Sequence, residues 1–228
     1  MSGLELVVFD VDGTLVDSQH HILAAMRFAF GRAGLPLPAR ETALGVVGLS
    51  LPQAMAALVP HLAPAEVEAI VADYRASFTE ERARGQGVPP LYPGARAALE
   101  RLAARPETLI GVATGKARRG LDHILAGHGL AHFVVTAQTA DDHPSKPHPS
   151  MLLRALAETG VEAGRAVMVG DTEFDIAMGR AAGMATVGVA WGYHARARLA
   201  AADAIIESFD ALDGALDGAL ARLAERRR

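Results

Sequence analysis

The sequence predicts an α/β protein with a doubly wound parallel sheet and a second, helical domain inserted after the first strand. Short apolar runs alternate with stretches of helical periodicity, which is the pattern of a parallel sheet covered by helices on both faces. Residues 18–85 interrupt this alternation, because they show helical periodicity and little clustering of β-branched residues. The 228 residues, half of them apolar, suffice for such an arrangement.

The expected strands are six apolar runs, at residues 4–9, 109–113, 133–137, 166–169, 185–190 and 204–206. Helices are expected before about residues 127, 158 and 182, and the leucines at 212, 216, 220 and 223 predict a final amphipathic helix. A segment rich in glycine and proline at 85–90 is the expected junction. We therefore assign residues 1–17 and 86–228 to the α/β domain and residues 18–85 to the inserted domain.

Composition and net charge exclude several classes of function. The net charge of −4 gives no general attraction for nucleic acid or an anionic membrane, and no run approaches the ~20 apolar residues of a membrane helix. The absence of cysteine excludes disulfides, thiolate metal sites and a cysteine nucleophile. We expect a cytoplasmic protein without a secretory signal, a monomer or homodimer, with no nucleic-acid or membrane partner.

Polar residues follow several of the expected strands. Asp10 and Asp12 follow the first one, Thr114 the second, and Asp171 the fourth, while Lys146 lies in a polar loop after the third. In parallel sheets such positions share one edge, where ligands bind at a switch point. Asp175 lies one helical turn after Asp171, on the same face. Converging carboxylates would repel one another without a cation, and their hard oxygens suit Mg²⁺.

These residue types together suit phosphoryl transfer. A cation, a hydroxyl and a lysine around one carboxylate can neutralise a phosphate group and align it for attack. Asp10 is the expected nucleophile, and Asp12 is the expected general acid for ester cleavage and then the base for attack by water. Thr114 and Lys146 complete the expected catalytic set.

Four segments resemble, in order, the motifs of the haloacid dehalogenase-like superfamily. They are Phe9-Asp-Val-Asp-Gly-Thr-Leu-Val-Asp-Ser18, Val112-Ala-Thr114, Ser145-Lys-Pro147 and Gly170-Asp-Thr-Glu-Phe-Asp175. Four ordered motifs are a strong signal, although any one alone is weak. The resemblance implies a Rossmann-like core and makes residues 18–85 an α-helical cap.

The resemblance also implies roles for single residues. The Asp10 side chain, the Asp12 backbone carbonyl, Asp171 and Asp175 would hold Mg²⁺, with Asp175 acting directly or through water. Thr114, the Gly115 backbone N–H and Lys146 would bind the phosphoryl group, and the cap loop Gly48-Leu49-Ser50 would face the substrate. Many relatives carry asparagine where this chain has Gly115, so a side-chain contact is lost here. A cis peptide bond is expected at Lys146-Pro147, because X–Pro bonds adopt it most readily.

The resemblance implies a small phosphorylated metabolite as substrate. The first motif, the cap Gly-Leu-Ser and Val189-Ala-Trp-Gly-Tyr193 most resemble phosphoglycolate phosphatases, which narrowly favours 2-phosphoglycolate. A sugar-phosphate phosphatase or a pyrophosphatase of the same superfamily would have almost the same sequence motifs. A sugar-phosphate mutase is disfavoured, because Ile22 stands where mutases carry histidine. The carboxylate of 2-phosphoglycolate needs a cationic or N–H-rich partner, and the cap's fixed cations are Arg27, Arg32, Arg40, Arg75, Arg82 and Arg84.

Two protein classes with other functions share some of these residue types. A receiver-type signalling module combines the same residue types, but it lacks a helical insertion and an aspartate two residues after the acceptor. Gly111–Ala117 superficially resembles a P-loop, but it has three residues between its glycines instead of four, and alanine follows its lysine. Lys116 is therefore expected to be a surface residue at a helix start, with a substrate contact as the alternative. Lys116 and Lys146 are the chain's two lysines among 22 basic residues.

Overall fold

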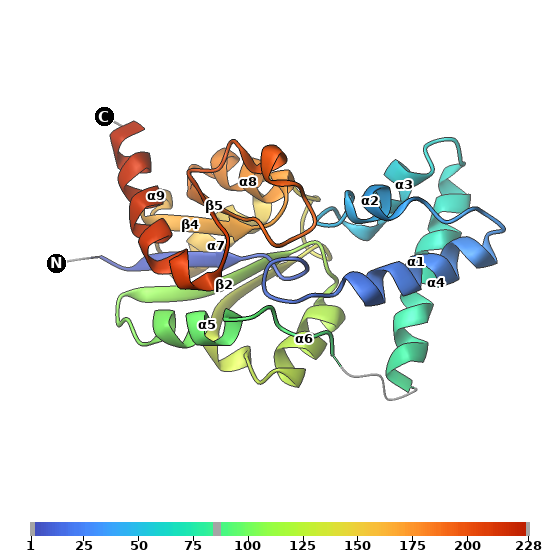
Figure 1. Cartoon of the computed structure of the whole chain (residues 1–228), viewed down its shortest axis with the longest axis horizontal. Helices are drawn as coiled ribbons and strands as arrows, with labels where there is room; N and C mark the ends of the chain where they lie inside the picture. The colour runs from blue at the N-terminus through green and yellow to red at the C-terminus, as the bar shows by residue number, and fades with distance from the viewer. Residues whose placement is uncertain (1–2, 84–87, 227–228) are drawn as a thin grey trace.

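A six-stranded parallel sheet forms the centre of the α/β part of the chain in the computed structural model, which describes residues 3–83 and 88–226 (Figure 1). Its strands run in the order β3-β2-β1-β4-β5-β6. Their bounds are β1 Glu5–Phe9, β2 Thr108–Thr114, β3 Val134–Thr139, β4 Ala166–Gly170, β5 Ala185–Val189 and β6 Ala204–Ile206. All six predicted strands are confirmed, with ends displaced by at most two residues.

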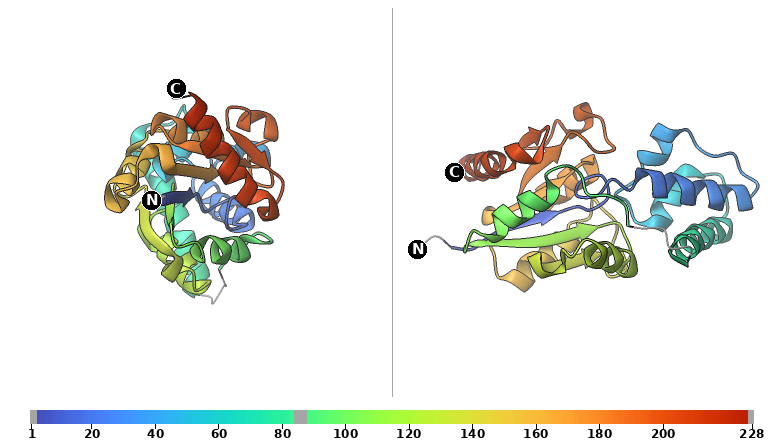
Figure 2. Two further views of the ribbon diagram at one scale, coloured as in Figure 1. Left: turned by 90° about the vertical axis from the view of Figure 1, so that its left-hand side faces the viewer. Right: turned by 60° about the horizontal axis from the view of Figure 1, so that its bottom comes forward.

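Helices cover both faces of this sheet (Figure 2). One face packs against α5 Ala95–Ala103, α6 Arg118–Gly127 and α9 Leu212–Arg226, and the other against α7 Ser150–Thr159 and α8 Glu173–Ala181. Strand β1 serves both cores, since Val7 and Phe9 point to the first face and Leu6 and Val8 to the second. The predicted doubly wound α/β fold is therefore confirmed.

The strand order reverses beside β1. The chain first builds β2 and β3 on one side of β1, then crosses to build β4, β5 and β6 on the other. Phe9, the last residue of β1, lies opposite Val112 of β2 and Val169 of β4. Asp10 consequently leaves the sheet at its switch point, where open α/β sheets bind ligands.

Helices α1–α4 gather beyond the carboxyl ends of the strands (Figures 1 and 2). They are α1 Gln19–Arg32, α2 Arg40–Leu44, α3 Leu51–Leu58 and α4 Pro64–Ala83. Buried side chains such as Met26, Phe30, Met55 and Ile70 give this group its own apolar core. The predicted first domain boundary, at residues 17–18, lies just before α1. The second, at residues 85–86, lies outside the described residues, so the division into domains stays a prediction.

The remaining elements are short 3-10 helices that connect the strands and helices. They are η1 Ala131–Phe133, η2 Ala163–Arg165, η3 Arg196–Leu199 and η4 Phe209–Ala211. Within residues 3–83 and 88–226, no helix has the length and apolar character needed to cross a membrane.

Candidate active site

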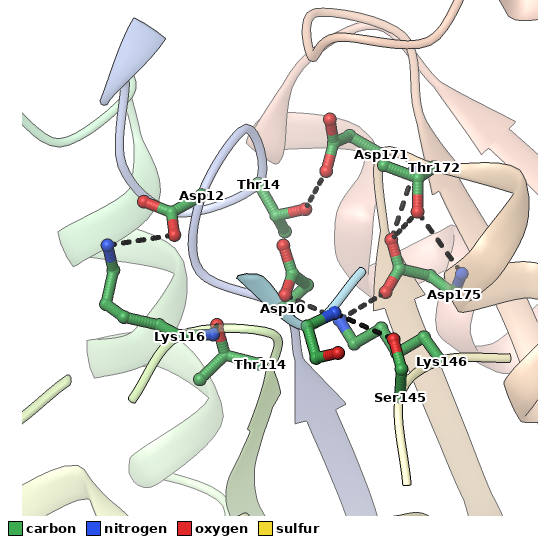
Figure 3. A network of polar contacts seen from close by, with 11 residues as sticks. Asp10, Asp12, Thr14, Thr114, Lys116, Ser145, Lys146, Asp171, Thr172 and Asp175 are labelled. Atoms are coloured by element: carbon green, nitrogen blue, oxygen red, sulfur yellow. Dashed lines mark hydrogen bonds and ion pairs between the residues drawn. The ribbon is translucent and has the colours of Figure 1, made fainter. Parts of the chain in front are cut away.

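Asp10 lies at the end of β1 with 1 % of its surface exposed. Lys146 Nζ donates to Asp10 Oδ1 and to Asp175 Oδ1, at 2.6 Å each (Figure 3). The other oxygen of Asp10, Oδ2, is buried and has no hydrogen-bond partner among the described residues. A buried carboxylate oxygen without a partner is costly, which makes Asp10 Oδ2 a candidate contact for a cation or a ligand.

Asp171 faces Asp10 from the end of β4 and is completely buried. Its Oδ1 accepts a hydrogen bond from Thr14 Oγ1 at 3.1 Å, and its Oδ2 accepts one from the Tyr193 backbone N–H at 2.8 Å. Gly13 permits this approach, because a Cβ there would lie 2.3 Å from Asp171 Oδ2 and its φ of +91° favours glycine. The loop after β1 and the loop after β5 therefore fix the Asp171 carboxylate from two sides.

Asp175 joins this group from the first turn of α8. Its Oδ2 accepts hydrogen bonds from the backbone N–H and the hydroxyl of Thr172, at 3.0 and 2.6 Å. Thr172 is the N-cap residue, and the pair forms a capping box that fixes the start of the helix. Since its Oδ1 accepts from Lys146, both oxygens of Asp175 have protein donors.

The carboxylates of Asp10, Asp171 and Asp175 form an acidic cluster that fits a divalent cation. One oxygen from each lies within 4.8 Å of the others, and all three residues are buried. Hard oxygen donors of this kind are what Mg²⁺ prefers. Asp10 Oδ2, which has no hydrogen-bond partner among the described residues, gives the fit independent support, because it leaves buried negative charge that a cation can neutralise.

The pKa values of the residues in the acidic cluster differ from their ordinary values. Burial raises the pKa of Asp10 from 3.8 to about 7. The positive charge of Lys146 opposes this rise, and the negative charge of Asp175 adds to it. Burial and the charges of Asp10 and Asp175 raise the pKa of Asp171 well above its usual value. Burial alone would lower the pKa of Lys146, but the adjacent Asp10 and Asp175 raise it above its ordinary value, so this lysine is a cation.

Asp12 lies beside the acidic cluster rather than in it. Its carboxylate accepts a hydrogen bond from Ser18 Oγ. It also forms an ion pair with Lys116, whose Nζ lies 3.0 Å from Asp12 Oδ2 (Figure 3). Lys116 lies at a helix start as expected, but the expectation that it is a surface residue is wrong. It precedes α6, its side chain is 16 % exposed, and it lines the site. A lysine after a strand end reaches inward here because Asp12 attracts its charge.

Thr114 and Gly115 form the opposite wall of the site. Thr114 is buried at the end of β2, and its hydroxyl accepts a hydrogen bond from the Lys116 backbone N–H at 3.2 Å. A Cβ on Gly115 would lie 2.5 Å from the Leu49 carbonyl oxygen and 2.7 Å from that of Gly48. The missing asparagine side chain thus leaves room for the backbone of the cap loop.

A cavity of about 690 Å³ opens between the cap and the core beside Asp10 and Asp12. The predicted cap loop Gly48-Leu49-Ser50 lines it, together with Thr114, Gly115 and Ser145. Of the cap arginines whose side chains the structure describes, Arg75 lines the cavity. Arg84 and the side chain of Arg82 lie outside the described part of the chain. The predicted cis bond at Lys146-Pro147 is confirmed.

Sequence reasoning assigned no role to several residues that join the cap to the core. Ser145 Oγ accepts a hydrogen bond from the Ser50 backbone N–H at 2.7 Å. His194 Nδ1 accepts from the Glu173 N–H at 3.1 Å, so its Nε2–H can donate to the Gly45 carbonyl at 3.0 Å. Burial lowers the pKa of His194, in keeping with this neutral tautomer. Such contacts join distant segments, and the nearby sequence carries no signal for them.

Comparison with known proteins identifies the family. A model described as "Haloacid dehalogenase-like hydrolase" matches residues 7–189. "Probable phosphatase IndB" of Dickeya dadantii is 36 % identical, and the alignment covers 92 % of each chain. A "Phosphoglycolate phosphatase" of Xanthomonas campestris is 34 % identical over 82 % of this chain and 83 % of its own.

Two further matches extend the comparison. "Tyrosine-protein kinase PtkA" of Mycobacterium tuberculosis is 36 % identical over 83 % of this chain, which spans 63 % of that longer protein. The crystal structure of a "predicted phosphoglycolate phosphatase" from Haemophilus somnus shares the fold, with a TM-score of 0.80, 24 % identity and coverage of 94 % and 98 %. The expected enzyme class, a phosphatase-type hydrolase, is confirmed by the family match and the phosphatase relatives. The chain therefore belongs to the haloacid dehalogenase-like hydrolases, in the group that resembles phosphoglycolate phosphatases.

Proposed function

We propose that this protein is a magnesium-dependent phosphatase that hydrolyses a small phosphorylated metabolite through a phosphorylated Asp10. The observation that carries the proposal is the Asp10 carboxylate itself. Lys146 holds one of its oxygens, while the other is buried beside a cavity that a substrate can enter and has no partner among the residues that the structure describes. A carboxylate fixed in this way has one oxygen available for attack and little freedom to lose on reaching the transition state.

In the first step, Asp10 Oδ2 attacks phosphorus and the bond from phosphorus to the ester oxygen breaks. The protonated carboxyl group of Asp12 gives its proton to the departing oxygen, so that an alcohol leaves. Lys146 and Thr114 hold the phosphoryl oxygens, and the Gly115 N–H adds a further donor. The product of this step is an aspartyl phosphate on Asp10.

In the second step, the Asp12 carboxylate takes a proton from water as the water oxygen attacks phosphorus. The bond between phosphorus and the Asp10 oxygen breaks, inorganic phosphate leaves, and Asp12 is protonated again for the next cycle. Asp12 suits both roles, because it lies two residues from the nucleophile and faces the cavity rather than the acidic cluster.

Asp10, Asp171, Asp175 and the Asp12 backbone carbonyl are the residues that would hold Mg²⁺. When bound, the ion would neutralise the negative charge that phosphate brings next to buried carboxylates. Asp10 and Asp171 are the stronger candidates for direct ligands. Each Asp171 oxygen accepts a single hydrogen bond from an uncharged donor, whereas Asp175 Oδ2 accepts two from Thr172 and its Oδ1 pairs with Lys146. This difference supports an indirect role for Asp175 through Lys146 and the start of α8.

The substrate that we favour is 2-phosphoglycolate. The supporting observations are the relatives named phosphoglycolate phosphatase and the chain's similarity to them over most of its length. A phosphate-transferring mutase is disfavoured further, because Ile22 lines the cavity and offers no proton-transfer group there. Hexose phosphates and pyrophosphate remain the competitors within the same family.

The test compares specificity constants for 2-phosphoglycolate, pyrophosphate and hexose phosphates in Mg²⁺ and in excess EDTA. We expect Mg²⁺-dependent multiple turnovers, whereas a receiver-type module would only lose its own phosphate slowly. Acid quenching during turnover, followed by mass spectrometry, should find phosphate on the peptide that contains Asp10. Full activity in EDTA, or a fully active Asp10→Asn variant, would contradict the mechanism; a low rank for 2-phosphoglycolate would contradict only the substrate.

A further inference from the structure

The wall of the cavity offers very few fixed charges for the organic part of a substrate. The cap loop from Gly45 to Gln53 carries no charged residue, although most of it lines the cavity. Among the described lining residues, the fixed cations are Arg75, Lys116 and Arg119. Lys146 does not compete for this task, because Asp10 and Asp175 surround its ammonium group.

Lys116 differs from the two arginines in how firmly it is held. Arg75 and Arg119 are exposed at the cavity rim, whereas the Lys116 side chain is 16 % exposed. A Cβ on Gly120 would lie 2.8 Å from Lys116 Cγ, so glycine on α6 leaves room for the lysine stem. The ammonium group lies 5.7 Å from the centre of the Phe78 ring on α4. Core and cap together therefore fix one cation at this point of the wall.

The Lys116 ammonium group lies beside Asp12, the residue that would act on the leaving group. Lys116 Nζ is 3.0 Å from Asp12 Oδ2, and Asp12 is the group that protonates the departing oxygen in the proposed mechanism. An anionic group one or two carbons from that oxygen would therefore come within reach of Lys116. Such an anion would replace Asp12 as the partner of the lysine and leave the Asp12 carboxyl group to the departing oxygen.

We propose that Lys116 is a specificity-determining residue that selects phosphate monoesters whose leaving group carries a second negative charge close to the ester oxygen. This inference rests on the proposed function and names its substrate class: short phosphorylated acids, rather than neutral alcohols or sugars. It also explains why lysine is kept here in a chain whose other basic residues, except Lys146, are arginines.

The test compares two esters that differ mainly in charge, 2-phosphoglycolate and 2-hydroxyethyl phosphate. The wild type should prefer the first, and Lys116→Met should lower the ratio of the two specificity constants about ten- to a hundredfold, mainly through KM. Arg154→Met removes an exposed cation on α7, away from the cavity, and should leave the ratio within about twofold. Lys116→Arg keeps a cation and should retain more of the preference than Lys116→Met.

Several outcomes would overturn the inference. Equal losses for both esters in Lys116→Met would mean that the lysine acts only through Asp12. A wild type without preference for the charged ester, or equal loss of preference in both Lys116 variants, would also reject it. Hydrolysis of 2-hydroxyethyl phosphate that depends on Asp10 would show that the proposed phosphatase function survives such a result. If the wild type hydrolyses neither ester nor any other phosphate monoester, both proposals fail together.

Discussion

Replacing Asp10 by asparagine should change how the stability of the metal-free protein depends on pH. The pKa of Asp10 is about 7 in the folded protein and 3.8 when unperturbed. The folded state therefore binds more protons than the unfolded state between about pH 4 and 7. The contribution of Asp10 to the free energy of unfolding is therefore largest below pH 4, and it is lost as the pH rises through 7. Asp10→Asn removes this loss, because an amide does not titrate.

The size of the effect follows from the same shift. A shift of about three pH units at about 1.4 kcal/mol per unit amounts to about 4 kcal/mol. No discount for solvent screening is needed, because Asp10 is 1 % exposed. The free energy of unfolding of Asp10→Asn, minus that of the wild type, should therefore rise by about 4 kcal/mol between pH 4 and pH 8. The attraction of Lys146 is already contained in this pKa, because Lys146 opposes the effect of burial on Asp10.

Urea unfolding in EDTA at four or five pH values measures this difference, with circular dichroism as the probe. Asp122→Asn, at an exposed aspartate on α6, is the matched control for loss of a carboxylate. Saturating Mg²⁺ should reduce the slope, because it binds the folded site and competes with protons there. Parallel stability curves for the wild type and Asp10→Asn in EDTA would refute the assignment of a raised pKa to Asp10.

Three further substitutions test the site. Asp12→Asn should lower kcat about 10²- to 10⁴-fold by removing proton transfer, and steady-state rates with any accepted ester check it. Gly115→Ala should lower kcat/KM about tenfold or more while the urea midpoint stays near that of the wild type, because its Cβ would press on the Leu49 carbonyl oxygen. Gly214→Ala, in open space on α9, is its control and should retain full activity. Thr172→Ala should cost about 1–2 kcal/mol in urea unfolding, through the lost N-cap of α8.

The fold was predictable because its signals are local. Each strand is a short apolar run, and burial on both faces of a parallel sheet requires such runs. Helix α5 was not predicted as a separate element, although its buried residues Ala95, Ala98, Leu99 and Leu102 recur at helical spacing. The Leu51-Pro52 pair interrupts the helical pattern in the sequence, and in the structure it begins α3, where proline is tolerated in the first turn.

The candidate site was predictable only in part. Asp10 and Asp171 follow strands directly, so sheet geometry alone brings them to one edge. Thr14 and the backbone of Tyr193 hold Asp171 in place, but 157 and 22 residues separate them from it in the sequence. Lys116 was misjudged because its sequence neighbours suggest a helix start, whereas its position is set by Asp12, which is distant in the chain.

Charge balance explains why the acidic cluster, the raised pKa values and the lysine occur together. Three buried carboxylates face one ammonium group, which leaves two uncompensated negative charges when all of them are ionised. Burial and the repulsion among these carboxylates raise the pKa values of Asp10 and Asp171, so protons on both groups can remove the two charges. A divalent cation can remove the same two charges without occupying the attacking oxygen with a proton. Asp10 would then be ionised at neutral pH, and a nucleophile needs that state. Metal binding and ionisation of the nucleophile are therefore expected to be coupled in one equilibrium. The Mg²⁺ concentration that gives half-maximal activity should fall as the pH rises from 6 to 8.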